Sequence, residues 1–276
     1  MSLPNVNITL GNGNIGAVTL SDDGIAGLIL TGTAVSSTLE LNKVYVIAST
    51  SDLKKLGLTA ENNPLAYKEV LGFYESAGDG AELHLLVVDA AKTLTEICSM
   101  EDGSPLKTLI DSAAGRIRLV GINRNPEDAY EPTVTSGIDQ DVVTAVTAAQ
   151  QVVESYLKQI APFVVLLPAL AWNGTTDSLY QPREGSQDSV SVVMASDGIY
   201  GESKYYSAAI GRVLGRLATC AVNISLARVR DGSLVADGYL TNGKKPEESY
   251  SLWNALHDAG YIFYRTYIGK NGYYLN

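Results

Sequence analysis

Residues 11–16 have a spacing that could bind the pyrophosphate of a dinucleotide. They read Gly-Asn-Gly-Asn-Ile-Gly, and in the G-x-G-x-x-G pattern backbone amides at the start of a helix approach the phosphate oxygens. The pattern works only where it opens a helix. Residues 17–24 instead combine β-branched side chains with a turn within one helical length, so we interpret the segment as part of a β-hairpin and assign no cofactor-binding residue.

Residues 238–245, Gly-Tyr-Leu-Thr-Asn-Gly-Lys-Lys, come close to a phosphate-binding P-loop. A P-loop needs Ser or Thr after its lysine to hold magnesium, and Lys245 occupies that place. Pro246, Glu247 and Glu248 follow, which puts negative charge where a triphosphate would meet the next helix. We therefore expect residues 242–243 to form a turn and a helix to begin at Pro246.

The remaining chemistry-bearing residues are few and scattered. His84 lies in an apolar strand and His257 in an amphipathic helix, and neither is near a Ser or Cys in a recognisable nucleophile setting. Cys98 and Cys220 have no second Cys or His at metal-ligand spacing, so both are expected to be ordinary buried thiols. We assign no catalytic, cofactor or metal residue.

An enzyme of α/β type would carry its site beyond the carboxyl ends of the strands. The polar residues expected there are Ser49, Thr50, Asp89, Asn123, Arg124 and Asn173. Asp89 resembles the magnesium-binding aspartate of nucleotide hydrolases, but without a P-loop it is an ordinary strand end. A nucleotide- or sugar-utilising α/β enzyme is therefore the alternative hypothesis, and a structural, non-enzymatic role is the leading one.

The composition indicates a soluble protein with a sizeable core. Of 276 residues, 46% are hydrophobic and 18% charged, and the formal net charge is −10. An acidic surface disfavours nucleic acid and anionic membranes as partners. No apolar run approaches the roughly 20 residues that a membrane-spanning helix needs, and the N-terminus lacks the features of a secretory signal, so we expect cytosolic synthesis without membrane insertion.

From about residue 43 onward, short apolar runs alternate with segments of helical period, which predicts an α/β fold: a mainly parallel or mixed sheet flanked by helices. The expected strands are Val44 to Ala48, Leu83 to Val88, Ile117 to Ile122, Phe163 to Leu167, Val190 to Met194, Val222 to Val229 and Tyr261 to Thr266. The expected helices cover residues 64–77, 139–160 and 204–219.

The first 42 residues have a different pattern. Val6, Ile8 and Leu10 alternate with polar residues, and Asn12-Gly13 is a type I′ turn signal. We expect an N-terminal β-hairpin or extended arm over residues 1–42, followed by one α/β domain over residues 43–276, in which residues 173–188 form an exposed loop or insertion.

Two features favour contacts with other proteins. Arg212 and Arg216 lie four apart on one helix face, where they could together meet a carboxylate-bearing partner. The tyrosines gather near the end of the sequence, among them Tyr267, Tyr273 and Tyr274, and tyrosine is favoured at interfaces.

The helix expected over residues 204–219 also carries Gly211 and Gly215 four residues apart. These glycines form a small-residue groove that lets another backbone approach closely.

Four stretches resemble the sheath proteins of contractile tails, in particular the version met in Bacteroidetes phages and prophage-like elements. They are Leu3 to Ile8 with its Gly-rich turn, Gly24 to Gly32, Ala208 to Arg216 and Arg265 to Tyr274. The resemblance implies a subunit that self-assembles into hexameric rings stacked around an inner tail tube, linked by exchanged terminal strands, and that contracts without nucleotide hydrolysis.

The resemblance also implies partners and a location. The partners would be copies of the chain itself, the inner tail tube protein, and baseplate and tail terminator proteins. The location would be a virion tail or an injection particle assembled in the bacterial cytoplasm. Val6, Ile8 and Leu10 would anchor the arm, and Arg212, Arg216, Tyr267, Tyr273 and Tyr274 would be further interface candidates. Relatives continue past the Gly-Tyr-Tyr segment into a tube-facing region, so tube-contact residues are not carried over. A tail-associated or surface adhesion protein is a third hypothesis.

Overall fold

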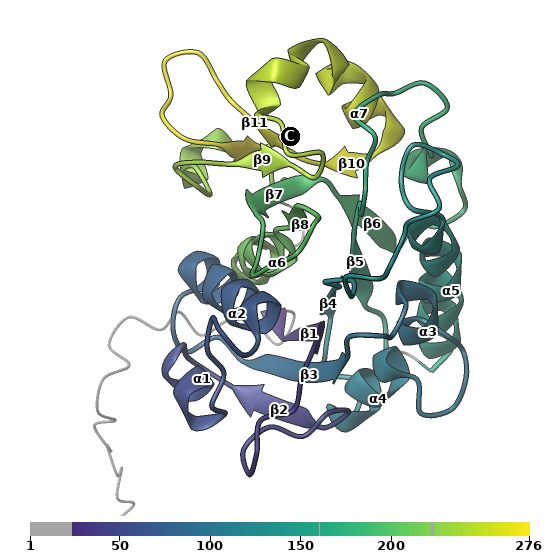
Figure 1. Ribbon diagram of the computed structural model, residues 1–276, viewed down its shortest axis with the longest axis vertical. Helices are drawn as coiled ribbons and strands as arrows, with labels where there is room; N and C mark the ends of the chain where they lie inside the picture. The colour runs from purple at the N-terminus through teal and green to yellow at the C-terminus, as the bar shows by residue number, and fades with distance from the viewer. Residues whose placement is uncertain (1–23, 160, 222–223) are drawn as a thin grey trace, which may run out of the picture.

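The computed structural model describes residues 24–159, 161–221 and 224–276, which form a seven-stranded sheet with helices on both faces (Figure 1). The strand order is β10-β6-β5-β4-β1-β3-β2. The strands are β1 Ala26–Gly32, β2 Val44–Ile47, β3 Leu83–Asp89, β4 Leu119–Asn123, β5 Val164–Pro168, β6 Val190–Val193 and β10 Tyr261–Ile262. Every neighbouring pair is parallel except β2 with β3, which is antiparallel. The predicted α/β fold is confirmed.

Strand β1 occupies the centre of the sheet, between β3 and β4, and was not among the predicted strands. Its alternate side chains enter two separate cores: Leu28 and Leu30 pack on one face and Ile29 on the other. A strand covered on both faces has no polar alternation, which is why it reads as a plain apolar run. The sheet therefore begins at residue 26 rather than after residue 42. The hairpin expected around residues 5–20 lies outside the described residues.

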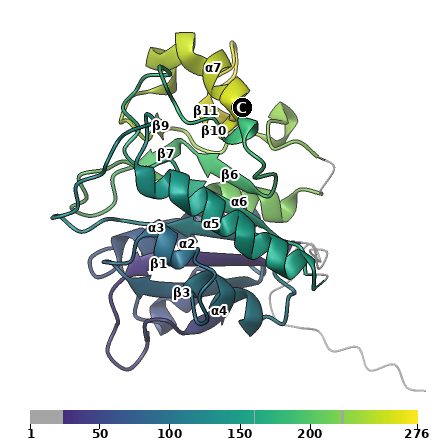
Figure 2. The same cartoon turned by 90° about the vertical axis from the view of Figure 1, so that its right-hand side faces the viewer.

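Two groups of helices cover the sheet. One face carries α1 (Ser51–Lys55), α2 (Pro64–Ala77) and α6 (Ile210–Thr219), and the other carries α3 (Leu94–Ile97), α4 (Pro105–Ser112) and α5 (Gln140–Leu157), which crosses in front of the sheet in Figure 2. The helix predicted over residues 64–77 is confirmed, and the one predicted over residues 139–160 is present as the shorter helix Gln140–Leu157. The first begins at Pro64, and the second begins after Asp139, whose carboxylate accepts the Asp141 amide at 3.2 Å.

Smaller elements gather beyond the β10 end of the sheet (Figure 1). Strands β7 (Ala195–Gly198), β8 (Ser207–Ala208) and β9 (Tyr239–Leu240) form an antiparallel sheet, and β11 (Tyr264–Arg265) pairs with β12 (Tyr274–Leu275). Helix α7 (Trp253–Ala259) follows the 3₁₀ segment η4 (Pro246–Leu252), and two short 3₁₀ turns are η2 (Pro182–Glu184) and η3 (Val229–Asp231). A helical segment thus begins at Pro246, as predicted.

Three predicted elements differ in the structure. The helix expected from residue 204 begins at Ile210, because Ser207 and Ala208 pair with β7. Residues 224–229 contain no strand and end in η3, while residues 222–223 lie outside the described residues. The strand expected over residues 261–266 is divided between two sheets, since β10 pairs with β6 and β11 pairs with β12.

Two segments that were predicted to be a loop and a turn have no long helix or strand in the structure. Residues 173–188 contain only the short turn η2 and are largely exposed. At residues 240–244, Gly243 has a φ of +82° and donates its amide to the Leu240 carbonyl at 2.8 Å, while Leu240 donates to the Lys244 carbonyl at 2.9 Å. This tight turn cannot cradle a triphosphate at a helix start, so the P-loop-like reading of residues 238–245 is excluded by geometry.

Helices α2 and α6 are in backbone contact, as the glycine spacing indicated. A Cβ on Gly211 would lie 2.0 Å from the Glu69 carbonyl oxygen, and one on Gly215 would lie 2.3 Å from the Phe73 carbonyl oxygen. Both obstacles are backbone atoms, so no side-chain rotation could relieve them. The two glycines therefore set how closely α6 approaches α2.

We predict that Gly211→Ala destabilises the chain by about 3 kcal/mol, because α6 must move away from α2. Gly72→Ala is the matched control in the same contact: its Cβ would lie 3.4 Å from the Arg212 amide nitrogen, an ordinary distance. Since alanine favours the helix by about 0.5 to 1 kcal/mol over glycine, this control should be neutral or stabilising. Urea unfolding measures both. Equal losses of stability would show that backbone proximity is not the constraint.

Candidate functional site

The polar residues that were expected beyond the carboxyl ends of the strands lie at two opposite edges of the sheet. Asp89, Asn123 and Arg124 lie at the carboxyl ends of β3 and β4. Ser49 and Thr50 follow β2, whose antiparallel course pairs Ile47 with Leu83 at the start of β3. They therefore lie at the opposite, amino edge. The expectation that all these polar groups would meet is wrong, because the sequence does not reveal the direction of β2.

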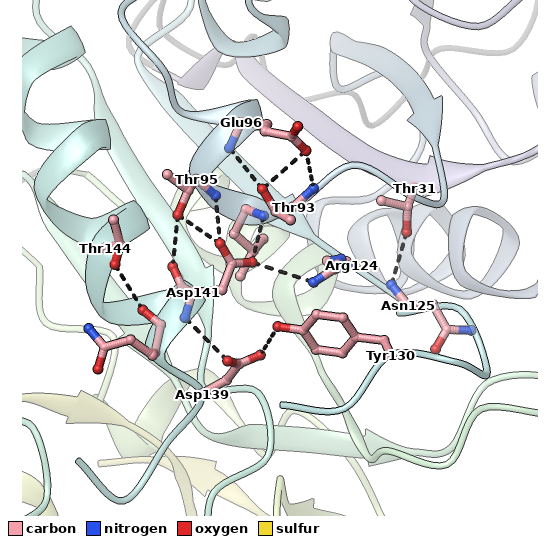
Figure 3. Close-up of polar contacts among 12 residues, drawn as sticks. Thr31, Thr93, Thr95, Glu96, Arg124, Asn125, Tyr130, Asp139, Asp141 and Thr144 are labelled. Carbon is pink, nitrogen blue, oxygen red and sulfur yellow. Dashed lines mark hydrogen bonds and ion pairs between the residues drawn. The ribbon is translucent and has the colours of Figure 1, made fainter. Parts of the chain in front are cut away.

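Arg124 and Asp141 are the centre of a buried polar network at the carboxyl edge (Figure 3). The Asp141 carboxylate accepts the backbone amides of Leu94 and Thr95 at 2.8 and 3.0 Å and the Thr95 hydroxyl at 2.7 Å. It also lies 3.4 Å from the guanidinium of Arg124. Asp141 thereby caps α3 from α5, so this carboxylate holds two helices together.

The same network includes Tyr130 and Asp139. The Arg124 guanidinium lies over the Tyr130 ring, 4.2 Å from its centroid, and the Tyr130 hydroxyl donates to Asp139 at 2.6 Å. Burial raises the pKa of Asp139 above its usual value. Nearby, the backbone amide of Asn125 donates to the Thr31 hydroxyl at 2.9 Å, and this hydrogen bond joins the ends of β4 and β1. These contacts are directed at neighbouring elements of the chain (Figure 3).

The other chemical candidates are also engaged locally. Asp89 accepts the Ala91 amide at 2.9 Å, and Asn173 accepts the Thr175 amide at 3.0 Å, both as turns. His84 is buried, 2.8 Å from Glu82, whereas His257 is exposed. Across residues 24–159, 161–221 and 224–276, no group of three or more His, Cys, Asp or Glu side chains could hold a metal ion. No helix in the same ranges could cross a bilayer.

Glu69 is a second buried polar centre, between α2, α6 and β4. One carboxylate oxygen accepts the Gly211 amide and the other accepts the Asn123 side-chain amide at 3.0 Å. Asn123 also donates to the Ala208 carbonyl at 2.7 Å. Burial raises the pKa of Glu69 to about 8, although the hydrogen bond from Gly211 opposes the shift. The sequence analysis missed Glu69, but its position between Ala66 and Phe73 on the apolar face of α2 was a usable signal.

Arg212 is engaged within the chain. Its guanidinium lies 2.7 Å from Asp197 and 2.6 Å from Glu75. Asp197 also accepts the Tyr264 hydroxyl at 2.8 Å, so it joins α6, β7 and β11. Arg216 donates to the Asp231 carbonyl at 3.0 Å. Both arginines therefore have internal partners, and Asp197, which no periodicity distinguishes, was missed because it becomes important only in three dimensions.

The tyrosines expected at an interface are mostly covered by the chain itself. Tyr273 and Tyr274 are buried, and their hydroxyls donate to Glu247 at 2.9 Å and to the Asn271 carbonyl at 3.3 Å. Tyr267 is half-buried, with its ring 5.4 Å from that of Tyr274. An interface role for these residues remains a prediction. The arm residues Val6, Ile8 and Leu10 lie outside the described residues.

The family profile described as "DUF2586, N-terminal domain" matches residues 3–276. The chain belongs to this family. No curated protein matches the sequence. Among solved structures, the chain is similar to the helical sheath of the anti-feeding prophage in its contracted state, with 17% identity, a TM-score of 0.56 and 100% of this chain covered. The sheath complex of PVC, an extracellular contractile injection system, gives 12% identity and a TM-score of 0.46, again over the whole chain.

The likeness to the anti-feeding prophage sheath establishes a shared fold. The alignment covers the length of this DUF2586 chain rather than the seven-stranded sheet alone. This chain spans 67% of the anti-feeding prophage protein and 65% of the PVC protein. The remaining third of each of those chains has no counterpart in the residues compared.

We predict that Glu69→Gln flattens the dependence of stability on pH between about pH 5 and pH 8. The pKa of Glu69 is about 8 in the folded chain and 4.5 without the protein environment. In that window the folded chain holds a proton that the unfolded chain releases, so stability falls as pH rises. Gln mimics the protonated form and removes this contribution.

Urea unfolding at a series of pH values measures the change. Glu184→Gln is the control, because this glutamate is exposed on η2 and should leave the slope unchanged. An unaltered slope in Glu69→Gln would mean that Glu69 is ionised throughout.

Proposed function

We propose that the chain is a structural subunit of a contractile tail sheath. The observation that carries the proposal is the fold shared with the anti-feeding prophage sheath protein over the full length of this chain. The sequence resemblance in the four stretches named above is an independent support. In this role copies of the chain assemble into hexameric rings stacked around an inner tube, and the rings contract together without nucleotide hydrolysis.

The network at the carboxyl edge favours this role over the enzymatic alternative. An α/β enzyme would bind its substrate at that edge, with polar side chains directed toward it. Here Asp141 caps α3, Asn123 uses its side chain on Glu69 and Ala208, and Asp139 is occupied by Tyr130. These groups stabilise the subunit, as a protein that transmits mechanical load requires.

Assembly would use backbone pairing as well as side chains. Residues 5–10 alternate apolar and polar side chains, which suits an arm that adds as a strand to a neighbouring sheet. Among the described residues, β2 is an edge strand with β3 as its one neighbour in the sheet, and its Val46 is 62% exposed. The inner tube protein, baseplate and terminator are the further partners in this proposal, within a virion or an injection particle assembled in the bacterial cytoplasm.

We predict that the purified chain forms rings or tubes at high protein concentration or with crowding agents, visible by negative-stain microscopy, and that deleting residues 1–10 abolishes them. The deletion should leave the secondary structure of the chain intact by circular dichroism, because the described strands of the main sheet begin at Ala26 or later.

Substitutions on one face of the arm at a time test which of its two faces is needed for assembly. Replacing Val6, Ile8 and Leu10 by Ser should prevent assembly, whereas replacing Asn5, Asn7 and Thr9 by Ser should not, since alternate residues of a strand face opposite sides. A chain that remains monomeric under all salt and crowding conditions would overturn the proposed function.

A further inference from the structure

An apolar groove of about 660 Å³ lies at the amino edge of the main sheet. The starts of β4 and β5 form its floor with Leu119 and Val164, and the last turns of α5 and α6 form its walls with Leu157 and Leu217. Arg118 is the one charged residue among the described residues that line it. The groove is therefore chemically the opposite of the polar network at the carboxyl edge.

The groove exposes large apolar side chains to solvent. Leu157 is 56% exposed and Val164 is 39% exposed, and they lie beside the buried Phe163 and Ala218. Apolar side chains gathered in one groove form a surface on which another apolar segment can pack. An uncharged, apolar occupant fits the lining best.

The described chain enters this groove at its first residue. Gly24 is part of the lining, and 23 residues precede it. Residues 1–20 carry no charged side chain. Apart from Arg118, the lining of the groove and the segment joined to it therefore share an uncharged character.

The sequence of that segment also predicts that it returns toward the groove. A two-residue turn at Asn12-Gly13 places Leu10 opposite Ile15 and Val6 opposite Thr19. Cross-strand neighbours share a face, so Val6, Ile8, Leu10 and Ile15 would form one apolar face. Since Thr19 precedes Gly24 by five residues, a fully extended connection leaves the hairpin within about 16 Å of the groove.

We propose that residues 5–20 dock as a hairpin in this groove of their own chain before assembly, with the apolar face on Leu157 and Val164. The docked hairpin covers the exposed apolar surface of the free subunit and keeps the apolar side chains of the arm from other partners. This inference concerns the single chain and holds whether or not the chain forms a sheath.

Cys220 provides a native probe, because it lines the groove as a free, partly exposed thiol. In the full chain, Val6→Cys and Ile8→Cys are made singly and oxidised mildly at low protein concentration. Docking predicts that at least one forms an intrachain disulfide with Cys220, which requires a Cα separation below about 7 Å. Mass spectrometry of tryptic peptides and non-reducing electrophoresis identify the bond and the monomeric product.

Two controls test the geometry. Asn7→Cys lies on the opposite face of the strand and should cross-link at least tenfold less. Adding Leu157→Asp, at an exposed position that the fold does not depend on, should lower the yield of the productive variant by a similar factor. A disulfide-linked dimer would assign the groove to a second copy. That result, equal cross-linking by Asn7→Cys, or no cross-link from either apolar position would overturn the proposal.

Discussion

The backbone contact between α2 and α6 is the constraint on which the rest of one face depends. Gly211 and Gly215 bring α6 against the carbonyl oxygens of Glu69 and Phe73. At that distance the Gly211 amide reaches the Glu69 carboxylate, and Glu69 in turn holds Asn123 at the end of β4. The next residue of α6, Arg212, reaches Asp197 and through it Tyr264. One pair of glycines thus positions elements from four regions of the chain.

The two edges of the sheet are different in kind. At the carboxyl edge several polar groups pair with one another, such as Asp141 with α3 and Tyr130 with Asp139, although Arg124 Nε and Asn125 Oδ1 are buried without a hydrogen-bond partner. Burying such groups costs free energy unless each finds a partner, and here most partners come from another helix or loop. The amino edge has an open apolar surface instead. The polar contacts of the fold are therefore concentrated at one edge of the sheet and its exposed apolar side chains at the other.

The sequence predicted what local patterns encode. The α/β alternation, the helix at residues 64–77 and the turn at Asn242-Gly243 follow from periodicity and from turn residues, and the structure has them. It did not predict that β1 is central, because its apolar run lies within the first 42 residues, which were assigned to a separate arm, and strand order depends on tertiary pairing. The direction of β2 and the partners of Asp197 depend on tertiary pairing. Arg212 was singled out for its spacing, but that spacing did not reveal Asp197 as its partner.

The position of β1 has a consequence for synthesis on the ribosome. The first described strand has both neighbours only after β3 and β4 have been made, and its Leu28 and Leu30 face is covered by α2 together with α6, which begins at Ile210. More than half of the chain must emerge before this core can be sealed. Such long-range closure slows folding and leaves apolar surface open to association with other chains until α6, which ends at Thr219, has been made.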